Sequence, residues 1–352
     1  MKSVCFVLPE IAGHPVGGYK IAFEYANRLA SDDFNVSILF LNDLAFKKHK
    51  IPKIIKNPIQ NYRTILEPRW FNLDKRIKKI SSTQLKFKEK LQDVDIVIAT
   101  AVETVYPTLN LFKNSEKFYL IQGLEDWNVS REDLFKTYNM GFKKIVISKW
   151  LKKIVDENSQ DSAVYIKNPI DIKRYHVITP IEERSKYAIG MLNHSSLLKG
   201  SKDGLQAIEL VRLKYPNLRV YMFGTVKPAK NLPNWIDYTW NASTEETIDI
   251  YNRISIFVNP SIKEGFGLTG LEAMACGAAL ASTKYAGVKE YAVDNDNALL
   301  SPVKDPRKLA DNIEKLITNP KLRMNIAKAG VLNAQRFSWD DAYKKFKKVI
   351  LS

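Results

Sequence analysis

The sequence predicts an α/β protein made of two doubly wound domains, each built around a parallel sheet. Short runs of β-branched and aromatic residues alternate along the chain with helical patterns, which is typical of βαβ units. The alternation is interrupted at Asn168-Pro169-Ile170-Asp171, which we interpret as a linker. The length of 352 residues also suits two domains. We therefore expect domains at residues 1–169 and 170–337, with a last helix, 338–352, that packs back on the first domain.

The first domain is expected to open with a strand at residues 4–8, followed by a Gly/Pro loop and a helix at residues 19–30. The apolar residues of that helix keep helical spacing. They are Ile21, Ala22, Tyr25, Ala26 and Leu29. Further strands are expected at residues 36–41, 95–100, 118–121, 144–148 and 164–166.

The second domain repeats the alternation. Strands are expected at residues 187–191, 218–223, 254–258, 279–281 and 298–300. Helices are expected at residues 202–214, 244–252, 269–276 and 306–317, and two more helical patterns follow. Ligands of such sheets bind beyond the carboxyl ends of the strands, so two facing sheets would form a deep cleft between the domains.

Composition excludes several classes of protein. Hydrophobic residues make up 45% of the chain and charged residues 26%, which excludes disordered and fibrous proteins. No apolar window is long enough for a membrane-spanning helix, and the apolar run at residues 4–8 is too short for a secretory signal. Two cysteines and four scattered histidines provide neither a disulfide framework nor metal-ligand spacing. We expect a cytoplasmic protein without a metal.

The formal net charge of +16 is unevenly distributed. Residues 46–90, here called the basic segment, contain 14 lysines and arginines and three acidic residues. Apolar side chains alternate with these cations, namely Trp70, Phe71, Ile77, Ile80, Leu85 and Phe87. Such a stretch can lie on an anionic membrane surface, and a plain solvated lysine-rich face is an equal alternative. No nucleic-acid-binding motif accompanies the charge, so we do not expect a nucleic-acid partner.

The most informative motif runs from Asn259 to Gly277. It follows an apolar strand and leads into a helix, and its glycines allow a ligand to approach the backbone closely. The start of the helix presents unpaired N–H groups that suit a phosphate. Glu264 and Glu272 can accept hydrogen bonds from hydroxyls of one extended ligand. These residues alone predict a polyol-phosphate or nucleotide site; the alternative is an ordinary helix start whose acids complement the helix dipole.

Two glutamates in the frame Glu-Gly-Phe-Gly-Leu…Leu-Glu-Ala-Met-Ala-Cys-Gly resemble the signature of glycosyltransferase family 4. The resemblance extends over nearly the whole chain, through an early Gly-Gly loop, the linker and a Lys-Gly pair. It implies the GT-B fold, in which two facing Rossmann-like domains act without a metal. The first domain would be the acceptor side, and the second would bind a nucleotide sugar.

The resemblance assigns roles within the motif. Glu272 would hold the ribose hydroxyls of the donor, and Glu264 would hold hydroxyls of the donor sugar and take part in catalysis. Backbone N–H groups would contact the sugar or the diphosphate, and they belong to Gly265, Phe266, Gly267 and Leu268. A carboxylate that accepts hydroxyl hydrogen bonds in this way discriminates strongly against ligands that lack them.

Lys199 would stabilise the leaving diphosphate as the second catalytic residue. The family usually places an arginine shortly after the strand glycine, but here Gly190 is followed by Met191, with His194 nearby. Either another cation substitutes for this arginine or the diphosphate is bound more weakly. A surface lysine at a turn is the alternative interpretation of Lys199.

In the first domain, Gly17 and Gly18 match the family's flexible glycine loop, although a plain turn is the alternative. Gln122 stands where many members carry a histidine that contacts the donor sugar, and glutamine cannot titrate; a polar residue that merely ends a strand is an equal alternative. Glu103 follows another strand and can contact the acceptor.

The implied activity is the retaining transfer of a sugar from a nucleoside-diphosphate sugar, with dTDP-rhamnose the first choice because the chain looks like surface-polysaccharide rhamnosyltransferases. The acceptor would be a hydroxyl of a growing surface glycan on a lipid carrier, with the enzyme peripheral on the inner face of the cell membrane. UDP- or GDP-hexose donors, or a non-catalytic GT-B partner subunit, are the alternatives.

Overall fold

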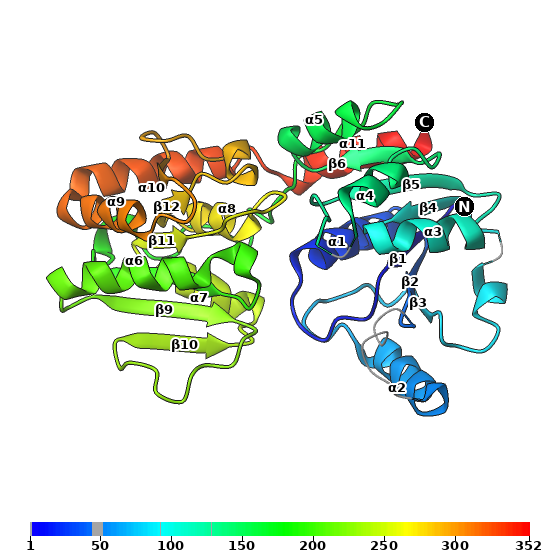
Figure 1. Ribbon diagram of the computed structural model, residues 1–352, viewed down its shortest axis with the longest axis horizontal. Helices are drawn as coiled ribbons and strands as arrows, with labels where there is room; N and C mark the ends of the chain where they lie inside the picture. The colour runs from blue at the N-terminus through cyan, green and yellow to red at the C-terminus, as the bar shows by residue number, and fades with distance from the viewer. Residues whose placement is uncertain (1, 44–51, 92, 128) are drawn as a thin grey trace. The chain divides into compact units, whose positions relative to one another are not determined.

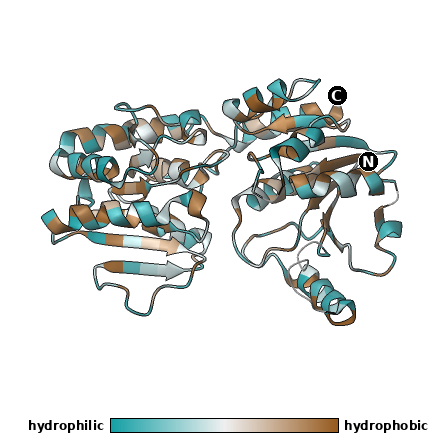
Figure 2. Cartoon of the chain, in the orientation of Figure 1, coloured by the Kyte–Doolittle hydropathy of each residue, from teal (hydrophilic) through white to brown (hydrophobic). Residues whose placement is uncertain are grey.

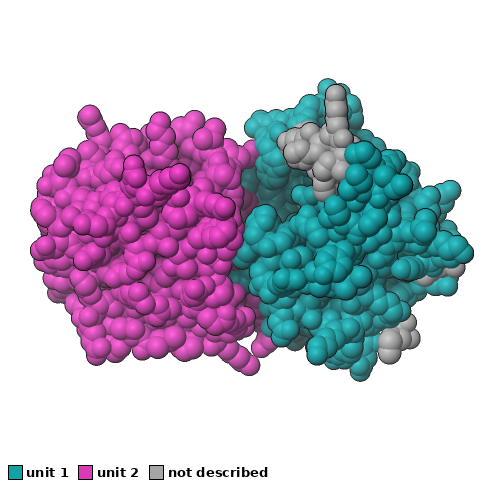
Figure 3. Space-filling view, turned by 90° about the horizontal axis from the view of Figure 1, so that it is seen from below, with its two compact units in different colours: residues 1–166, 343–352 teal, residues 167–342 magenta. Residues whose placement is uncertain are grey.

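The structure, a computed structural model, describes residues 2–43, 52–91, 93–127 and 129–352 (Figure 1). The chain forms two compact units (Figure 3). The first comprises Met1–Ile166 and Tyr343–Ser352, and the second comprises Lys167–Ala342. The boundary expected from the sequence lies after residue 169, with all of residues 338–352 in the first domain. In the structure the second unit begins at Lys167, and the chain returns to the first unit at Tyr343.

The first unit contains a parallel sheet with the strand order β3-β2-β1-β4-β5-β6-β7. Its strands are β1 (Ser3–Leu8), β2 (Asn35–Phe40), β3 (Lys78–Ser81), β4 (Ile96–Ala99), β5 (Glu116–Ile121), β6 (Lys143–Val146) and β7 (Val164–Tyr165). Its helices are α1 (Gly17–Ser31), α2 (Lys53–Leu66), the 3-10 helix η1 (Phe87–Leu91), α3 (Val102–Leu111), α4 (Arg131–Thr137) and α5 (Lys149–Glu157). The central strands are buried on both faces because helices cover a parallel sheet on both sides.

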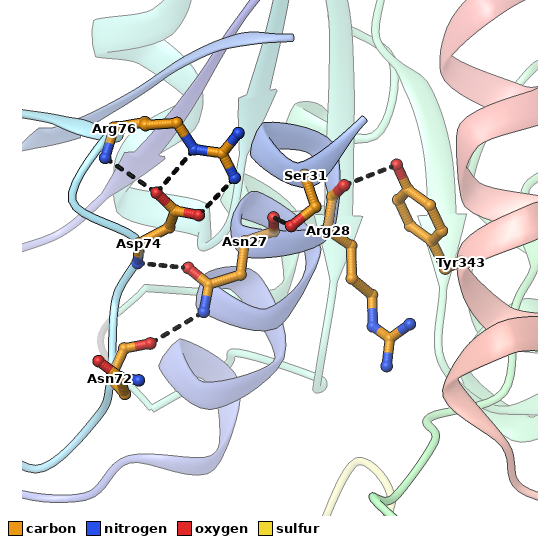
Figure 4. Close-up of polar contacts among 7 residues, drawn as sticks. All are labelled: Asn27, Arg28, Ser31, Asn72, Asp74, Arg76 and Tyr343. Atoms are coloured by element: carbon orange, nitrogen blue, oxygen red, sulfur yellow. Dashed lines mark hydrogen bonds and ion pairs between the residues drawn. The ribbon is translucent and has the colours of Figure 1, made fainter. Parts of the chain in front are cut away.

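The end of α11 (Trp339–Leu351) packs on the first unit through aromatic and polar contacts. The ring of Phe346, which is fully buried, stacks on Tyr25 of α1 at 4.0 Å between centroids. The hydroxyl oxygen of Tyr343 lies within hydrogen-bond distance of two acceptors, the carboxylate of Asp32 at 2.7 Å and the carbonyl of Arg28 at 3.1 Å. Figure 4 shows the bond from Tyr343 to Arg28. The last helix therefore completes the core of the first unit.

The second unit contains a parallel sheet with the strand order β10-β9-β8-β11-β12-β13. Its strands are β8 (Ala188–Asn193), β9 (Arg219–Gly224), β10 (Ile236–Trp240), β11 (Ile256–Asn259), β12 (Ala279–Thr283) and β13 (Ala298–Ser301). Its helices are α6 (Ser201–Lys214), α7 (Thr244–Arg253), α8 (Leu268–Ala275), α9 (Pro306–Thr318) and α10 (Pro320–Ala334), with 3-10 helices η2 (Ile181–Glu183), η3 (Leu197–Lys199) and η4 (Gly287–Glu290). The predicted α/β class with two parallel-sheet domains is confirmed.

Local signals account for several helix starts. Ser243 and Glu246 form a reciprocal capping box at the start of α7, with N···O distances of 3.1 and 2.7 Å. The carboxylate of Asp305 and the amide oxygen of Asn319 cap α9 and α10, each of which has proline at its first position.

Several elements of the structure were not expected from the sequence, namely α2, β3, α3, α4, α5 and β10. Strands β3 and β10 lie at the edges of their sheets, where short strands carry polar residues and lack a continuous apolar run. Helices α2 and α3 each contain a proline, which obscures the helical pattern.

Candidate active site

The candidate site of the second unit lies at the point where the strand order of its sheet reverses. Strands β8 and β11 are neighbours there, and each leads onward in the opposite direction across the sheet. The turn that carries Lys199 follows β8, and the loop that carries Glu264 follows β11. Ligands of doubly wound sheets bind at such a switch point, beyond the carboxyl ends of the strands.

Lys199 and Glu264 are in direct contact. The ammonium of Lys199 donates a hydrogen bond to Oε2 of Glu264 at 2.6 Å, and the hydroxyl of Ser261 donates to the other oxygen, Oε1. The Lys199 side chain is 28% exposed and that of Glu264 9%, so the pair is shielded from water but open on the side of the lysine. The two residues predicted to be catalytic therefore form one charged group.

Close packing holds the Lys199 turn against the Glu264 loop. Gly200 has a φ of +62°, and a Cβ placed there would lie 2.1 Å from the carbonyl oxygen of Pro260. The N–H groups of Ile262 and Lys263 both donate to the carbonyl of Leu198, at 2.8 and 3.2 Å. The Lys-Gly pair thus positions the lysine because only glycine fits beside Pro260.

A hydrogen-bonded pair of tyrosines supports the glycine-rich loop. Gly267 precedes α8 with a φ of +94°, and a Cβ there would lie 2.0 Å from the hydroxyl of Tyr285. The hydroxyls of Tyr285 and Tyr291 are 2.9 Å apart, and Tyr291 donates to the carbonyl of Gly267 at 2.8 Å. Asn259 at the end of β11 donates to Tyr285 at 2.9 Å. Burial raises the pKa of both phenols, so they remain hydrogen-bond donors.

Glu272 lies in the middle of α8 and is only 6% exposed. The Tyr251 hydroxyl of α7 donates to its Oε2 at 3.5 Å, and burial holds the pKa of that phenol well above its usual value. Helix α8 begins at Leu268, so Glu272 is its fifth residue. A buried carboxylate of this kind requires hydrogen-bond donors.

The other residues of the motif divide into side chains and backbone. Phe266 is 2% exposed, and its ring packs on those of Tyr291, at 5.5 Å, and Phe337, at 5.9 Å. Its side chain therefore belongs to the core, and only its backbone can serve a ligand. Gly265 lies between Glu264 and this ring, while Leu268 is the first residue of α8. The early N–H groups of a helix lack intrahelical acceptors, which makes this end electropositive.

The predicted residues of the first unit form a separate group. Gly17 and Gly18 begin α1, and Nε2 of Gln122, after β5, donates to the carbonyl of Gly18 at 3.1 Å. The Oε1 atom of Gln122 is buried and accepts no hydrogen bond from the described residues. Glu103 lies in the first turn of α3, directly after β4.

Sequence reasoning missed Glu125, which is 6% exposed and accepts a hydrogen bond from the N–H of Val102 at the start of α3. Burial raises its pKa to about 8, and the nearby charge of Glu103 contributes to the shift. It also missed Ser261 and Tyr251, which orient the two glutamates. Their signal is weak because a single hydroxyl in a loop or helix carries no pattern.

The position of the missing arginine is occupied by a core residue. Met191 is fully buried in β8, and the imidazole of His194 accepts a hydrogen bond from the N–H of Ser196 through Nδ1 at 2.9 Å. Within residues 2–43, 52–91, 93–127 and 129–352, no group of three or more His, Cys, Asp or Glu side chains could hold a metal ion. In the same ranges, no helix is both long and apolar enough to cross a bilayer.

Comparison with known proteins finds a family model that matches the second unit and relatives that match about half of the chain. Residues 172–332 match the family model for glycosyl transferases group 1. An uncharacterized glycosyltransferase of Methanocaldococcus jannaschii is 26% identical over 215 residues, which cover 59% of this chain and 58% of that protein. A D-inositol 3-phosphate glycosyltransferase of Corynebacterium urealyticum is 25% identical over 177 residues, or 46% of this chain and 42% of the other. The chain thus spans less than two thirds of these curated relatives.

Solved structures match over the whole chain at low identity. HepE from Anabaena in complex with UDP-glucose has a TM-score of 0.76 at 14% identity, covering 99% of both chains. Sucrose-phosphate synthase from Thermosynechococcus elongatus has the same TM-score and identity, covering 99% of this chain and 98% of the other. Residues 172–332 are therefore similar to group 1 glycosyl transferases, and the two Rossmann-like domains of the chain have the GT-B fold of these structures.

Proposed function

We propose that this protein is a retaining glycosyltransferase whose second unit binds a nucleoside-diphosphate sugar. The observation that carries the proposal is the contact between Lys199 and Glu264 at the switch point of a group 1 glycosyl transferase domain. Carboxylates can accept hydrogen bonds from the hydroxyls of a sugar and a ribose, and an ammonium and a helix start can bind a diphosphate.

The charged pair gives each residue a role. Glu264 accepts hydroxyl hydrogen bonds from the donor sugar, because a carboxylate has more acceptor sites than the two that Lys199 and Ser261 use. The ammonium has three donors and spends one on Glu264, so the others are available for the diphosphate. Glu272 holds the ribose hydroxyls, and backbone N–H groups at residues 265–268 contact the sugar and diphosphate.

The reaction needs a leaving group with stabilised charge. The acceptor hydroxyl attacks the anomeric carbon from the face that the leaving group vacates, and the bond from that carbon to the phosphate oxygen breaks. The acceptor proton passes to an oxygen of the departing diphosphate, and the configuration is retained. Lys199 and the N-terminus of α8 offset the new negative charge, so we propose that no metal takes part.

We propose dTDP-rhamnose as the donor and a surface glycan on a lipid carrier as the acceptor, with the protein working at an anionic membrane surface on the cytoplasmic side. The resemblance to surface-polysaccharide rhamnosyltransferases and the glutamine at position 122 support this donor. UDP-hexoses are the alternative, since the HepE structure contains UDP-glucose. Gly17, Gly18 and Gln122 are proposed to contact the donor from the first unit.

A donor panel tests the proposal. The purified chain is incubated with dTDP-rhamnose, UDP-glucose and GDP-mannose, and release of the nucleoside diphosphate is measured with and without EDTA. We expect release from dTDP-rhamnose that EDTA does not change. Release only from the UDP or GDP sugar would refute the rhamnose donor, and no release or binding of any donor would favour a non-catalytic subunit.

A matched pair of lysine variants tests the catalytic role. Lys199→Ala should lower turnover by about 10²–10³, because loss of one preformed donor to developing charge typically has this effect. Lys202→Ala, at an exposed lysine in the first turn of α6, is the control and should retain activity. Equal turnover in the two variants would contradict the role of Lys199.

A further inference from the structure

Helix α2 exposes an apolar face to solvent. Five large side chains lie within an arc of roughly 140° at about 100° per residue. Their exposed fractions are 83% for Ile54, 54% for Ile55, 49% for Ile59, 63% for Tyr62 and 67% for Ile65. Figure 2 shows the hydrophobic colour on this helix, at the margin of the first unit.

The opposite face of α2 is polar and faces the protein. Lys56, Gln60 and Thr64 are buried, at 7%, 1% and 1% exposed. Lys56 donates to the carbonyl of Asp43 at 3.1 Å, and the side-chain amide of Asn42 donates to the hydroxyl of Thr64 at 3.0 Å. A helix on a soluble domain normally buries its apolar stripe, so the packing of α2 is inverted.

The C-terminal end of α2 is bonded to the neighbouring strand β3. The ammonium of Lys79, from β3, donates to the carbonyls of Ile65 and Glu67 at the end of α2. This cation satisfies carbonyl groups that the helix end would otherwise leave open. Thr64 and Lys56 are thus bonded to Asn42 and Asp43, the amide of Gln60 is buried without a hydrogen-bond partner among the described residues, and the isoleucines point outward. A contiguous apolar row of this size marks an interaction surface.

The apolar residues that the sequence analysis assigned to a membrane face are mostly inside the protein. Ile77 and Ile80 are 5% and 3% exposed, and the rings of Trp70 and Phe71 pack on Phe23 of α1 at 5.7 and 5.4 Å. Of the six, Leu85 is the fully exposed side chain, and residues 46–51 of the basic segment lie outside the described residues.

Polar contacts hold this part of the chain on α1, as Figure 4 shows. The amide of Asn27 donates to the carbonyl of Asn72 at 2.9 Å and accepts from the N–H of Asp74 at 2.8 Å. The apolar surface is therefore supplied by α2, while the rest of the segment supplies charge.

The surroundings of α2 in the chain are strongly cationic. Within residues 52–90 there are 11 lysines and arginines against three acidic residues. Glu89 is the exposed acid of this range, and Glu67 and Asp74 are half-buried. The exposed cations are Lys53, Arg69, Lys75, Arg76, Lys78, Lys86, Lys88 and Lys90. This charge complements anionic lipid headgroups and repels a second copy of the chain.

We infer that the outward face of α2 inserts into the surface of an anionic lipid bilayer, and that exposed cations of residues 52–90 contact the headgroups. Interfacial helices bury an apolar face to the depth of the headgroup boundary, and isoleucine and tyrosine side chains suit that position. This inference deepens the proposed membrane partner and rests on it, but it does not depend on the donor or on transfer.

Vesicle binding without any nucleotide sugar tests the inference, so its failure is separable from failure of the transferase proposal. The full chain is sedimented with vesicles of phosphatidylcholine alone or with about a third of phosphatidylglycerol. We expect binding to the anionic vesicles, with weaker binding at high salt because salt screens the cations. Ile54→Glu/Ile65→Glu should lower the partition at least about tenfold, since two apolar side chains leave the lipid.

Two controls separate the effect from misfolding. Ile54→Ala/Ile65→Ala keeps helix propensity and should also weaken binding, to a smaller extent. Leu213→Glu places the same charge on an exposed leucine of α6, 81% exposed, and should bind as the unaltered chain does. Equal binding of both double variants and the unaltered chain would overturn the inference. So would a dimer in light scattering that Ile54→Glu/Ile65→Glu dissolves, because a second copy would then occupy the face.

Discussion

Replacing Glu125 with glutamine should make the protein more stable at alkaline pH and change little at acidic pH. The carboxyl is 6% exposed, accepts the N–H of Val102, and lies 3.4 Å from the hydroxyl of Tyr119. Glutamine keeps an acceptor for both donors and carries no charge. The substitution therefore removes the ionisation and preserves the hydrogen bonds.

The magnitude follows from the pKa of Glu125, which burial raises from an ordinary value of 4.5 to about 8. Between these values the folded protein keeps the proton and the unfolded chain releases it. The folded state then binds more protons, so the free energy of unfolding falls as pH rises. The free energy of unfolding falls by at most about 1.4 kcal/mol per pH unit. By about pH 8 the total loss reaches at most about 5 kcal/mol.

Thermal melts at several pH values measure the effect. The melting temperature of Glu125→Gln minus that of the unaltered protein should grow by roughly 5 °C or more between about pH 5.5 and pH 8. Glu132→Gln, at an exposed acid of α4, is the control and should show no such trend. If the melting temperatures of Glu125→Gln and the unaltered protein differ by the same amount at all pH values, Glu125 is not a buried, protonated carboxyl.

Three further variants test the packing within each unit. Gly267→Ala should destabilise the second unit by about 1–3 kcal/mol, because its Cβ would lie 2.0 Å from the Tyr285 hydroxyl, and it should weaken donor binding; an unchanged melting curve and affinity would contradict this. Arg184→Met should lower the free energy of unfolding by at least about 3 kcal/mol, because Arg184 is 6% exposed and its guanidinium donates to several backbone carbonyls. Denaturant unfolding measures the loss, and a loss below about 1 kcal/mol would contradict this role of the guanidinium. Phe346→Ala should lower the free energy of unfolding by about 3–5 kcal/mol, because it leaves a cavity against Tyr25. Hydrogen exchange of the α1 amides should become faster, and unchanged exchange would contradict the packing of α11 on α1.

The site could be predicted from the sequence where residues close in the chain carry it. Glu264, Gly267 and Glu272 belong to one strand–loop–helix unit, so spacing alone places them together. The contact of Lys199 with Glu264 joins residues 65 positions apart, and only the neighbouring positions of β8 and β11 in the sheet bring them together. The resemblance to a family implied that Lys199 and Glu264 both serve the donor, but it did not predict the hydrogen bond between them.

The sequence by itself determined the fold class and the strands of both sheet centres, because a strand buried on both faces must be a continuous apolar run. The edge strands β3 and β10 could not be predicted in this way, because half-exposed strands tolerate lysine and aspartate. Only the tertiary structure decided which face of α2 is outside. Periodicity shows that a helix has two faces, but the side that packs depends on the partners, and here Asn42 and Asp43 bond side chains of the polar one.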